Sequence, residues 1–295
     1  MIAMWLVGQP VLAKDLPAPP MGDAVPAPVP ERGKLLATAG LIQLEGAGGG
    51  GLAPWAFITG YGTRDAVGAN LHGTVVRVTD FILSTAGVAV GLYDRLELSY
   101  ARQVFDSGVV GRGLGIGGGF QFSQDVYGAK LRLFGDGVMD QDSWLPQVAA
   151  GVQHKVNNRR AVLRAIGARS DQGTDFYLAA TKLFLAQSLV LNATVRMTRA
   201  NQLGILGFGG DRNNAYRPEF EGSVALLLSR TVAVGAEYRT KPNNLRFARE
   251  SDWFDVFVTW LPTKSVSATL AYVNLGSIAT RKQQEGVYAS IQLGF

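Results

Sequence analysis

Cysteine and long hydrophobic runs are both missing from this 295-residue sequence. A cysteine-free chain is compatible with export through an oxidising compartment. Hydrophobic residues make up 47% of the chain. Past the N-terminus, however, no run approaches the roughly 18 apolar residues that a membrane-spanning helix requires. The sequence therefore argues against a helical membrane protein.

Concentrated charge of one sign is absent as well. The formal net charge is only +5, and the lysines and arginines are scattered along the chain. No basic patch is interleaved with aromatic residues, which argues against nucleic acid as a partner. Scattered charge of this kind is typical of a solvated rim, which could also meet anionic lipopolysaccharide.

The motifs of catalysis, phosphate binding and metal binding are incomplete. His72 and His154 are the only histidines, and no nucleophile-elbow motif accompanies them. Neither Gly48–Gly51 nor the GxGxxG spacing that begins at Gly113 has the context of a phosphate-binding loop. Asp140–Asp142 lacks the spacing and closing glutamate of an EF-hand. The sequence predicts no enzyme activity, no metal and no cofactor.

What the chain does contain is alternation, seen best in Glu285–Phe295, which reads EGVYASIQLGF. Every second residue from Val287 to Phe295 is apolar, so an extended strand would have one apolar and one largely polar face. This stretch resembles the terminal signal by which outer-membrane barrels are recognised for insertion. We assign that signal to Tyr288, Ile291, Leu293 and Phe295, with the barrel assembly machinery as the expected partner.

The same alternation recurs along the chain and predicts an all-β, antiparallel, up-and-down transmembrane barrel. We count about 14 strands, with 12 or 16 as alternatives. Trp55–Gly62 is the first expected strand, and Ala161–Ala168 is expected to be another. Tryptophans and tyrosines near strand ends suit aromatic girdles at the membrane interfaces, namely Trp55, Trp144, Tyr238, Trp260 and Tyr272.

Connection lengths predict which end of the barrel faces out. The short turns at 157–159, 186–188 and 229–231 alternate with longer, Gly- and Asn-rich segments, as periplasmic turns alternate with external loops. Asp106–Asp125 does not fit, because it is long but falls on the periplasmic side by strand count. Either it folds into the lumen as a constriction, or a pair of crossings has been missed there.

Four regions are expected. Residues 1–13 resemble a secretory signal peptide without the usual basic start. Residues 14–33 are proline-rich and predict an extended periplasmic linker. Residues 34–53 are expected to form a glycine-rich plug or turn segment, and residues 54–295 the barrel.

Charged side chains on the strands are expected to face the lumen, because Arg or Lys facing lipid at mid-depth costs about 2–4 kcal/mol. The candidates that line the lumen are Glu97, Lys130, Arg132, Arg196, Glu219, Glu221, Glu237, Arg239 and Asp255. They could pair with one another and fill a plugged barrel, or line an aqueous pathway. Both signs are present, so neither anion nor cation preference is predicted.

Several longer strings carry a family resemblance. These are GKLLATAGLIQLEGAGGGGLAPWAFITGYGT from Gly33, DVYGAKLRLFGD from Asp125, DQDSWLPQVAAGVQHK from Asp140, RPEFEGSVALLLSRTVAVGAEYRTKPNNL from Arg217 and DWFDVFVTWLPTKSVSATLAYVNLG from Asp252. The chain resembles a proteobacterial family of outer-membrane proteins of unknown function from about Gly33 onward. The DWFDVFV and NNL segments are also similar to exopolysaccharide-associated outer-membrane proteins. The resemblance implies a location and an architecture, and no activity.

Together these features predict a bacterial outer-membrane channel or uptake pore for small solutes, surrounded by lipid and lipopolysaccharide. The alternative is a plugged, non-transporting barrel with a role in structure, envelope assembly or polysaccharide export. A lumen packed by 34–52 or 106–124 would favour the alternative, whereas a continuous water path past Glu219, Glu237 and Arg239 would favour the channel.

Overall fold

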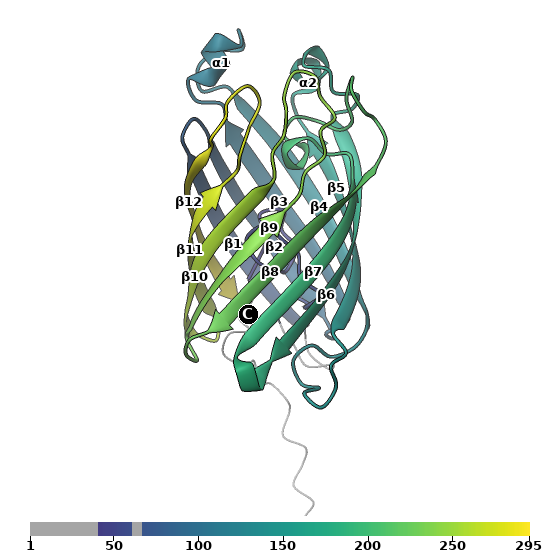
Figure 1. Cartoon of the computed structure of the whole chain (residues 1–295), viewed down its shortest axis with the longest axis vertical. Coiled ribbons are helices and arrows are strands. Elements are labelled where there is room, and N and C mark those ends of the chain that lie inside the picture. Colours follow the sequence, from purple (N-terminus) through teal and green to yellow (C-terminus); the bar gives the residue numbers. More distant parts are fainter. Residues whose placement is uncertain (1–40, 61–66) are drawn as a thin grey trace, which may run out of the picture. The chain divides into compact units, whose positions relative to one another are not determined.

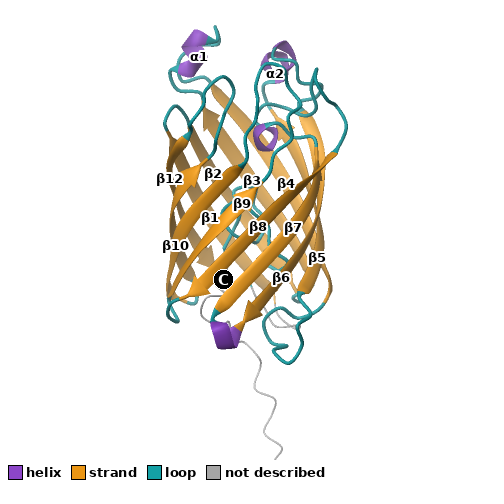
Figure 2. Ribbon diagram, viewed as in Figure 1, coloured by secondary structure: helices purple, strands orange, loops and turns teal. Residues whose placement is uncertain are grey.

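A computed structural model describes residues 41–60 and 67–295, and these form a closed barrel of twelve antiparallel strands (Figures 1 and 2). Each strand pairs with its neighbours in sequence, and β1 pairs with β12 to close the wall. The strands are β1 (Val67–Val78), β2 (Ile82–Leu92), β3 (Leu96–Asp106), β4 (Gln121–Phe134), β5 (Gln147–Asn157), β6 (Gln172–Phe184), β7 (Leu189–Thr198), β8 (Arg217–Leu227), β9 (Val232–Arg239), β10 (Trp253–Thr263), β11 (Val266–Asn274) and β12 (Glu285–Gly294).

The alternation of the sequence becomes the alternation of the wall. Along β1 and β12, buried and exposed residues follow one another with period two. Ile291, Leu293 and Phe295 of the predicted insertion signal are exposed on the outer, lipid-facing side, and Tyr288 points inward and is buried. The wall is therefore apolar outside and mixed inside, as a membrane barrel requires.

The predicted count of about 14 strands is wrong, and 12, the lower alternative, is right. Residues 55–60 of the expected strand Trp55–Gly62 do not form a wall strand, because 41–60 is buried inside the barrel, and residues 61–62 lie outside the described residues. Ala161–Ala168 is not a strand either, because it overlaps the helix α2 (Arg160–Ala165). Trp55 is consequently buried and does not belong to an aromatic girdle, whereas Tyr238 and Trp260 are exposed on the outer face.

Without these two expected strands, the long connections fall mostly at one end of the barrel and the short turns mostly at the other. One end of the barrel carries α2 and the long connections 199–216, 240–252 and 275–284. The segment between β3 and β4, which contains the four-residue helix α1 (Val110–Gly113), lies at the same end. The expectation that 106–125 is periplasmic is therefore wrong, because the count was shifted by one false crossing before it. The described termini of the wall, at β1 and β12, lie at the opposite end with most of the short turns. We call this end the periplasmic end and the other the outer end, because outer-membrane barrels place short turns in the periplasm.

The helical elements of the described chain are short. Besides α1 and α2 there are two single-turn 3₁₀ helices, η1 (Leu185–Gln187) and η2 (Gln202–Gly204). Within residues 41–60 and 67–295, no helix has the length and apolar character needed to cross a membrane. The predicted signal peptide, the predicted linker and the start of the predicted plug, up to residue 40, lie outside the described residues.

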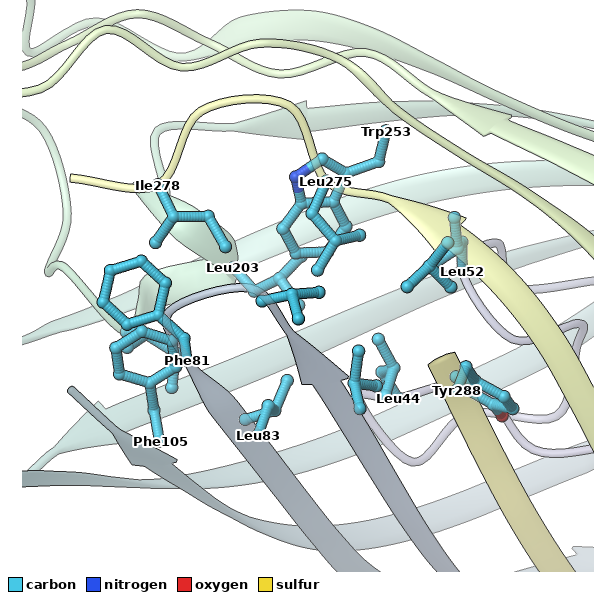
Figure 3. Close-up of a cluster of buried hydrophobic side chains, with 14 of the residues drawn as sticks. Leu44, Leu52, Phe81, Leu83, Phe105, Leu203, Trp253, Leu275, Ile278 and Tyr288 are labelled. Atoms are coloured by element: carbon cyan, nitrogen blue, oxygen red, sulfur yellow. The ribbon is translucent and has the colours of Figure 1, made fainter. Parts of the chain in front are cut away.

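The interior changes character along its height. Asn70, His72 and Thr74 face inward in the periplasmic half of β1, while Val76 and Val78 face inward near its outer end. Figure 3 shows the apolar cluster of the outer half, where side chains from connecting loops meet side chains of the wall. Its labelled members in this region are Phe81, Leu83, Phe105, Leu203, Trp253, Leu275 and Ile278.

Small inward-facing residues of the wall make room for the internal segment. A substitution at Gly91 of β2 tests this. A Cβ at Gly91 would lie 1.9 Å from the Thr59 carbonyl oxygen, so Gly91→Ala must displace the segment. We expect the free energy of unfolding, measured by denaturant titration in micelles, to fall by about 1–3 kcal/mol.

The matched control is Gly73→Ala on β1, where a Cβ would have no heavy atom within 4 Å. We expect this variant to stay within about 0.5 kcal/mol of the natural protein. Equal effects of the two substitutions would show that contact with the internal segment does not decide the stability of the wall.

Candidate functional site: the plugged lumen

Residues 41–60, here called the plug, occupy the interior of the barrel, and nearly all of them are buried. The plug is folded without regular secondary structure, through single bridges that pair Ile42 with Gly48 and Gly49 with Pro54. Its first turn places Gly46 at φ +92°, a left-handed conformation that favours glycine. A Cβ at Gly46 would also lie 2.9 Å from the Ala101 Cβ, so glycine permits both the turn and the close approach to the wall.

Glu45 lies at the tip of this turn and is the centre of a buried charge network. Its carboxylate pairs with Lys155 of β5, with Arg239 of β9 at 2.7 Å, and with Arg196 of β7 at 3.7 Å. All four side chains are at most 6% exposed. One acidic residue of the plug is therefore tied to three strands of the wall.

Two acidic residues of the wall complete the network. Asp175 lies 2.6 Å from the Lys155 ammonium, and Glu221 lies 3.3 Å from the Arg239 guanidinium and also pairs with Arg196. Three carboxylates thus face three cations. This balance matters because an unpaired charge in a dry interior costs several kcal/mol.

A second pair holds the other arm of the plug. Glu97 of β3 and Lys130 of β4 are 3.0 Å apart and both are buried. Glu97 accepts hydrogen bonds from the backbone N–H groups of Gly48 and Thr59, and the Lys130 ammonium donates to the carbonyls of Gly48 and Trp55. This ion pair satisfies backbone groups that would otherwise be buried without partners.

Glu237 of β9 holds the loop of the plug between these two anchors. It accepts hydrogen bonds from the Leu52 N–H at 2.7 Å and from the Ser223 hydroxyl at 2.5 Å. Asp255 of β10 is paired directly with Glu237 in the strand register and is also buried. Two acidic side chains therefore share one side of the lumen, next to the plug.

Uncharged wall residues satisfy more of the plug backbone. The Ala56 N–H donates to the Thr181 hydroxyl, and the Gln147 amide donates to the Ala56 carbonyl. Thr194 donates to the Pro54 carbonyl, and the Trp55 indole N–H donates to Ser223. The plug is therefore bound mainly through its backbone and through Glu45.

The structure places the nine predicted lumen residues in two groups. Glu97, Lys130, Arg196, Glu221, Glu237 and Arg239 surround the plug, and Asp255 lies beside Glu237. The other two lie away from it. Arg132 pairs with Asp94 and Asp136 at the periplasmic end, and half-buried Glu219 accepts a hydrogen bond from Thr240 at the outer end.

Sequence reasoning missed three members of the central network. Lys155 and Asp175 follow the same inward alternation as their neighbours on β5 and β6, so that signal could have found them. Glu45 carries no such signal, because the plug has no period. A carboxylate beside a four-glycine run does not by itself indicate three buried cations.

A second group of residues fills the lumen in its outer half, on the outer side of the plug. Leu203, Ile205 and Leu206 of the β7–β8 connection are buried within the apolar cluster of the lumen. The carboxylate of Glu250 accepts hydrogen bonds from the Gln202 N–H and pairs with Lys241 at 2.9 Å. We call residues 201–206, together with Lys241 and Glu250, the cap.

The ion pair of the cap lies above the strands and is buried. Burial lowers the pKa of Lys241 to about 8, although Glu250 beside it acts in the opposite direction. Burial also raises the pKa of the Glu250 carboxyl, although Lys241 acts against it. Both shifts favour the neutral forms, so this pair is held by the surrounding fold against its own desolvation.

The plug and the cap are joined by a short chain of hydrogen bonds. Gln103 of β3 donates to the Leu44 carbonyl of the plug at 2.8 Å. Gln124 of β4 donates both to Gln103, at 2.9 Å, and to the Leu203 carbonyl of the cap, at 3.0 Å. The two wall glutamines therefore link the plug to the cap, because Gln103 contacts the plug and Gln124 contacts the cap.

The residues considered for catalysis and metal binding are not assembled into a site. His154 shares a hydrogen bond with Thr174 on the exposed side of β5. Asp140–Asp142 belong to the exposed β4–β5 connection at the periplasmic end. Among residues 41–60 and 67–295, no group of three or more metal-ligating side chains comes together.

Glu45→Gln tests the central network. It leaves three buried cations facing two carboxylates, and removing one member of a buried ion pair typically costs about 3–5 kcal/mol. We expect lower stability and exposure of the plug. Because the chain has no cysteine, Ala47→Cys can be introduced as a single thiol, and a water-soluble maleimide should label it faster in the Glu45→Gln background.

A double-mutant cycle separates charge balance from general damage. Glu45→Gln combined with Arg239→Gln leaves two cations facing two carboxylates, so the double variant should lose less stability than the sum of the two single variants. Asp142→Asn, in an exposed loop, is the control and should change neither stability nor labelling. Simple additivity of the two substitutions would contradict the network.

Comparison with known proteins places this fold among outer-membrane barrels. The solved KdgM porin aligns with a TM-score of 0.50 at 9% identity, over 77% of this chain and 99% of that one. The NanC porin aligns at 0.49 and 10%, over 77% and 98%. An outer-membrane channel of Pseudomonas putida F1 aligns at 0.46 and 12%, over 78% and 94%.

At these identities, the likeness to the KdgM porin concerns the fold alone. No curated protein matches the sequence. The family model described as "Protein of unknown function (DUF3034)" matches residues 38–292, which includes the described part of the plug and nearly all of the barrel wall. The chain therefore belongs to the DUF3034 family, whose member described here is an outer-membrane β-barrel with the fold of the porins.

Proposed function

We propose that this protein is a gated outer-membrane channel for small solutes, and that the described conformation is its closed state. The proposal rests on one observation: the wall and the segment that fills it are different parts of the chain. The wall is a complete closed barrel, and the lumen is filled by a contiguous segment that precedes the first strand. A filling of this kind can leave without breaking any strand pair.

The chemistry of the wall around the plug supports a water-filled path. Its inward groups include Glu97, Lys130, Gln153, Thr181 and Asn192, which now contact the plug or one another. Each of these groups can exchange its present partner for water at small net cost, because water also donates and accepts hydrogen bonds. Polar groups at these positions can therefore serve both states, as partners of the plug backbone in the closed lumen and as partners of water in an open one.

The permanently plugged barrel is the second candidate, and one observation favours it. The described lumen is packed by 41–60, which overlaps the segment 34–52 whose packing would favour the non-transporting alternative. Glu45 and its partners Lys155 and Arg196 are entirely buried, so the closed state is strongly held. A test must therefore ask whether the closed state can open while the wall stays folded.

Conductance in planar bilayers makes that test. We expect the natural protein to be closed most of the time, because the plug and the cap close the lumen in series. Glu45→Gln loosens only the plug and Glu250→Gln only the cap, so each single variant should conduct little. The double variant should show steady current that far exceeds the sum of the two single variants.

A disulfide provides the control for the route of the current. Ala56 of the plug and Ala179 of β6 belong to one buried cluster, so Ala56→Cys with Ala179→Cys should tie the plug to the wall when oxidised. In the Glu45→Gln/Glu250→Gln background, oxidation should silence the current and a reductant should restore it. A correctly folded, reduced double variant without current would overturn the channel proposal in favour of the plugged barrel.

A further inference from the structure

The carboxylate of Glu45 occupies a site whose charged groups all belong to the wall. Its Oε1 pairs with the Lys155 ammonium, and its Oε2 lies 2.7 Å from the Arg239 guanidinium and 3.7 Å from the Arg196 guanidinium. The Gln43 amide of the plug also donates to Oε2. The two oxygens of the carboxylate therefore have separate cationic partners, and all three cations are at most 6% exposed.

The wall gives each of these cations a second partner that does not belong to the plug. Asp175 of β6 lies 2.6 Å from the Lys155 ammonium. Glu221 of β8 pairs with Arg196 and lies 3.3 Å from the Arg239 guanidinium. The three cations therefore remain anchored to the wall when Glu45 leaves, and the site stays organised for another anion.

Arg196 is held most firmly of the three. Besides its pair with Glu221, its guanidinium donates a hydrogen bond of 2.7 Å to the Gln153 side-chain oxygen. It also lies over the Tyr177 ring, 5.2 Å from the ring centre. These contacts come from β5, β6 and β8 and fix the direction of its remaining donors.

The charge balance of the site selects for an anion. Without Glu45, three cations face the carboxylates of Asp175 and Glu221, so one positive charge is in excess. A neutral or cationic solute would leave that excess uncompensated. A carboxylate would balance it through charge-assisted hydrogen bonds, with one oxygen at Lys155 and the other at the two arginines, as Glu45 does.

We propose that Lys155, Arg196 and Arg239 form a binding site for the carboxylate group of a small solute, and that Glu45 occupies this site in the closed lumen. The role of the site in transport rests on the proposed channel function, because a solute reaches it only through an open lumen. A solute carboxylate and Glu45 would compete for the same three cations, so the solute would favour the state in which the plug has left.

The test is chemical rescue of Glu45→Ala. This substitution removes one methylene and the carboxylate, which together have the size of acetate. The variant is unfolded and refolded by denaturant titration in micelles, followed by tryptophan fluorescence, in sodium acetate, sodium chloride of equal ionic strength, or sodium chloride with acetamide. Refolding with the probe present allows the probe to bind without entering a closed barrel.

We expect acetate to stabilise Glu45→Ala, because it binds the folded chain at the vacated site. Acetate at about ten times its dissociation constant should raise the folding equilibrium constant of this variant about tenfold relative to acetamide. The effect of acetate on the natural protein is subtracted, because acetate also stabilises proteins by exclusion from their surface. If Glu45→Ala does not refold in chloride, the folded fraction recovered in acetate and in acetamide is compared instead.

Two control variants test the three-cation site. Glu45→Ala combined with Arg239→Gln leaves two cations facing two carboxylates and should gain nothing from acetate. Glu250→Ala removes a buried carboxylate of the cap that pairs with Lys241 alone, and it should gain no more from acetate than the natural protein does.

Each contrary result overturns a stated part of the proposal. No rescue of Glu45→Ala by acetate would remove the site, and equal rescue of Glu250→Ala would show that one buried cation is sufficient. Equal rescue by chloride would remove the preference for a carboxylate. Because these measurements involve no current, a protein that acetate rescues but that never conducts would keep the anion site and lose only its role in transport.

Discussion

The width of a twelve-stranded barrel is the constraint on which the rest of this structure depends. Eight strands enclose an interior that side chains can fill, whereas sixteen or more leave an aqueous channel. Twelve strands lie between these cases, and the inward positions here include small residues such as Gly91, Ala101, Gly151 and Ala179. The wall cannot fill its own lumen, so the plug fills it. The polar side chains of the wall are then required as partners for the buried plug backbone.

Much of this architecture follows from period-two alternation, which is local. The identity of the wall as an antiparallel barrel, its lipid-facing side and the inward direction of Glu237 and Arg239 could all be predicted from strand sequences. The strand number could not. Trp55–Gly62 is apolar and short like a strand, and Ala161–Ala168 has enough β-branched and aliphatic residues to pass for one. Only the closure of the whole wall decides that neither is needed.

The candidate site was harder to predict because its central residue follows no period. Glu45 is surrounded by leucine, glutamine and glycine, and its partners Lys155, Arg196 and Arg239 are between 110 and 194 positions away in sequence. Its importance comes from three strands that approach one another through the barrel's curvature.

The same charge network explains how a strongly held plug could still leave. In the plugged lumen, buried Glu45 is needed to balance Lys155, Arg196 and Arg239, and losing it is costly. Once water enters, the effective dielectric constant rises and the same charges are solvated, so the cost of separating them falls steeply. On the proposed channel function, the barrier to opening therefore lies mainly in wetting the lumen. On the same proposal, the apolar outer half that includes Leu203 and Trp253 would oppose that wetting, while Gln103 and Gln124 keep the cap and the plug in hydrogen-bonded contact until it occurs.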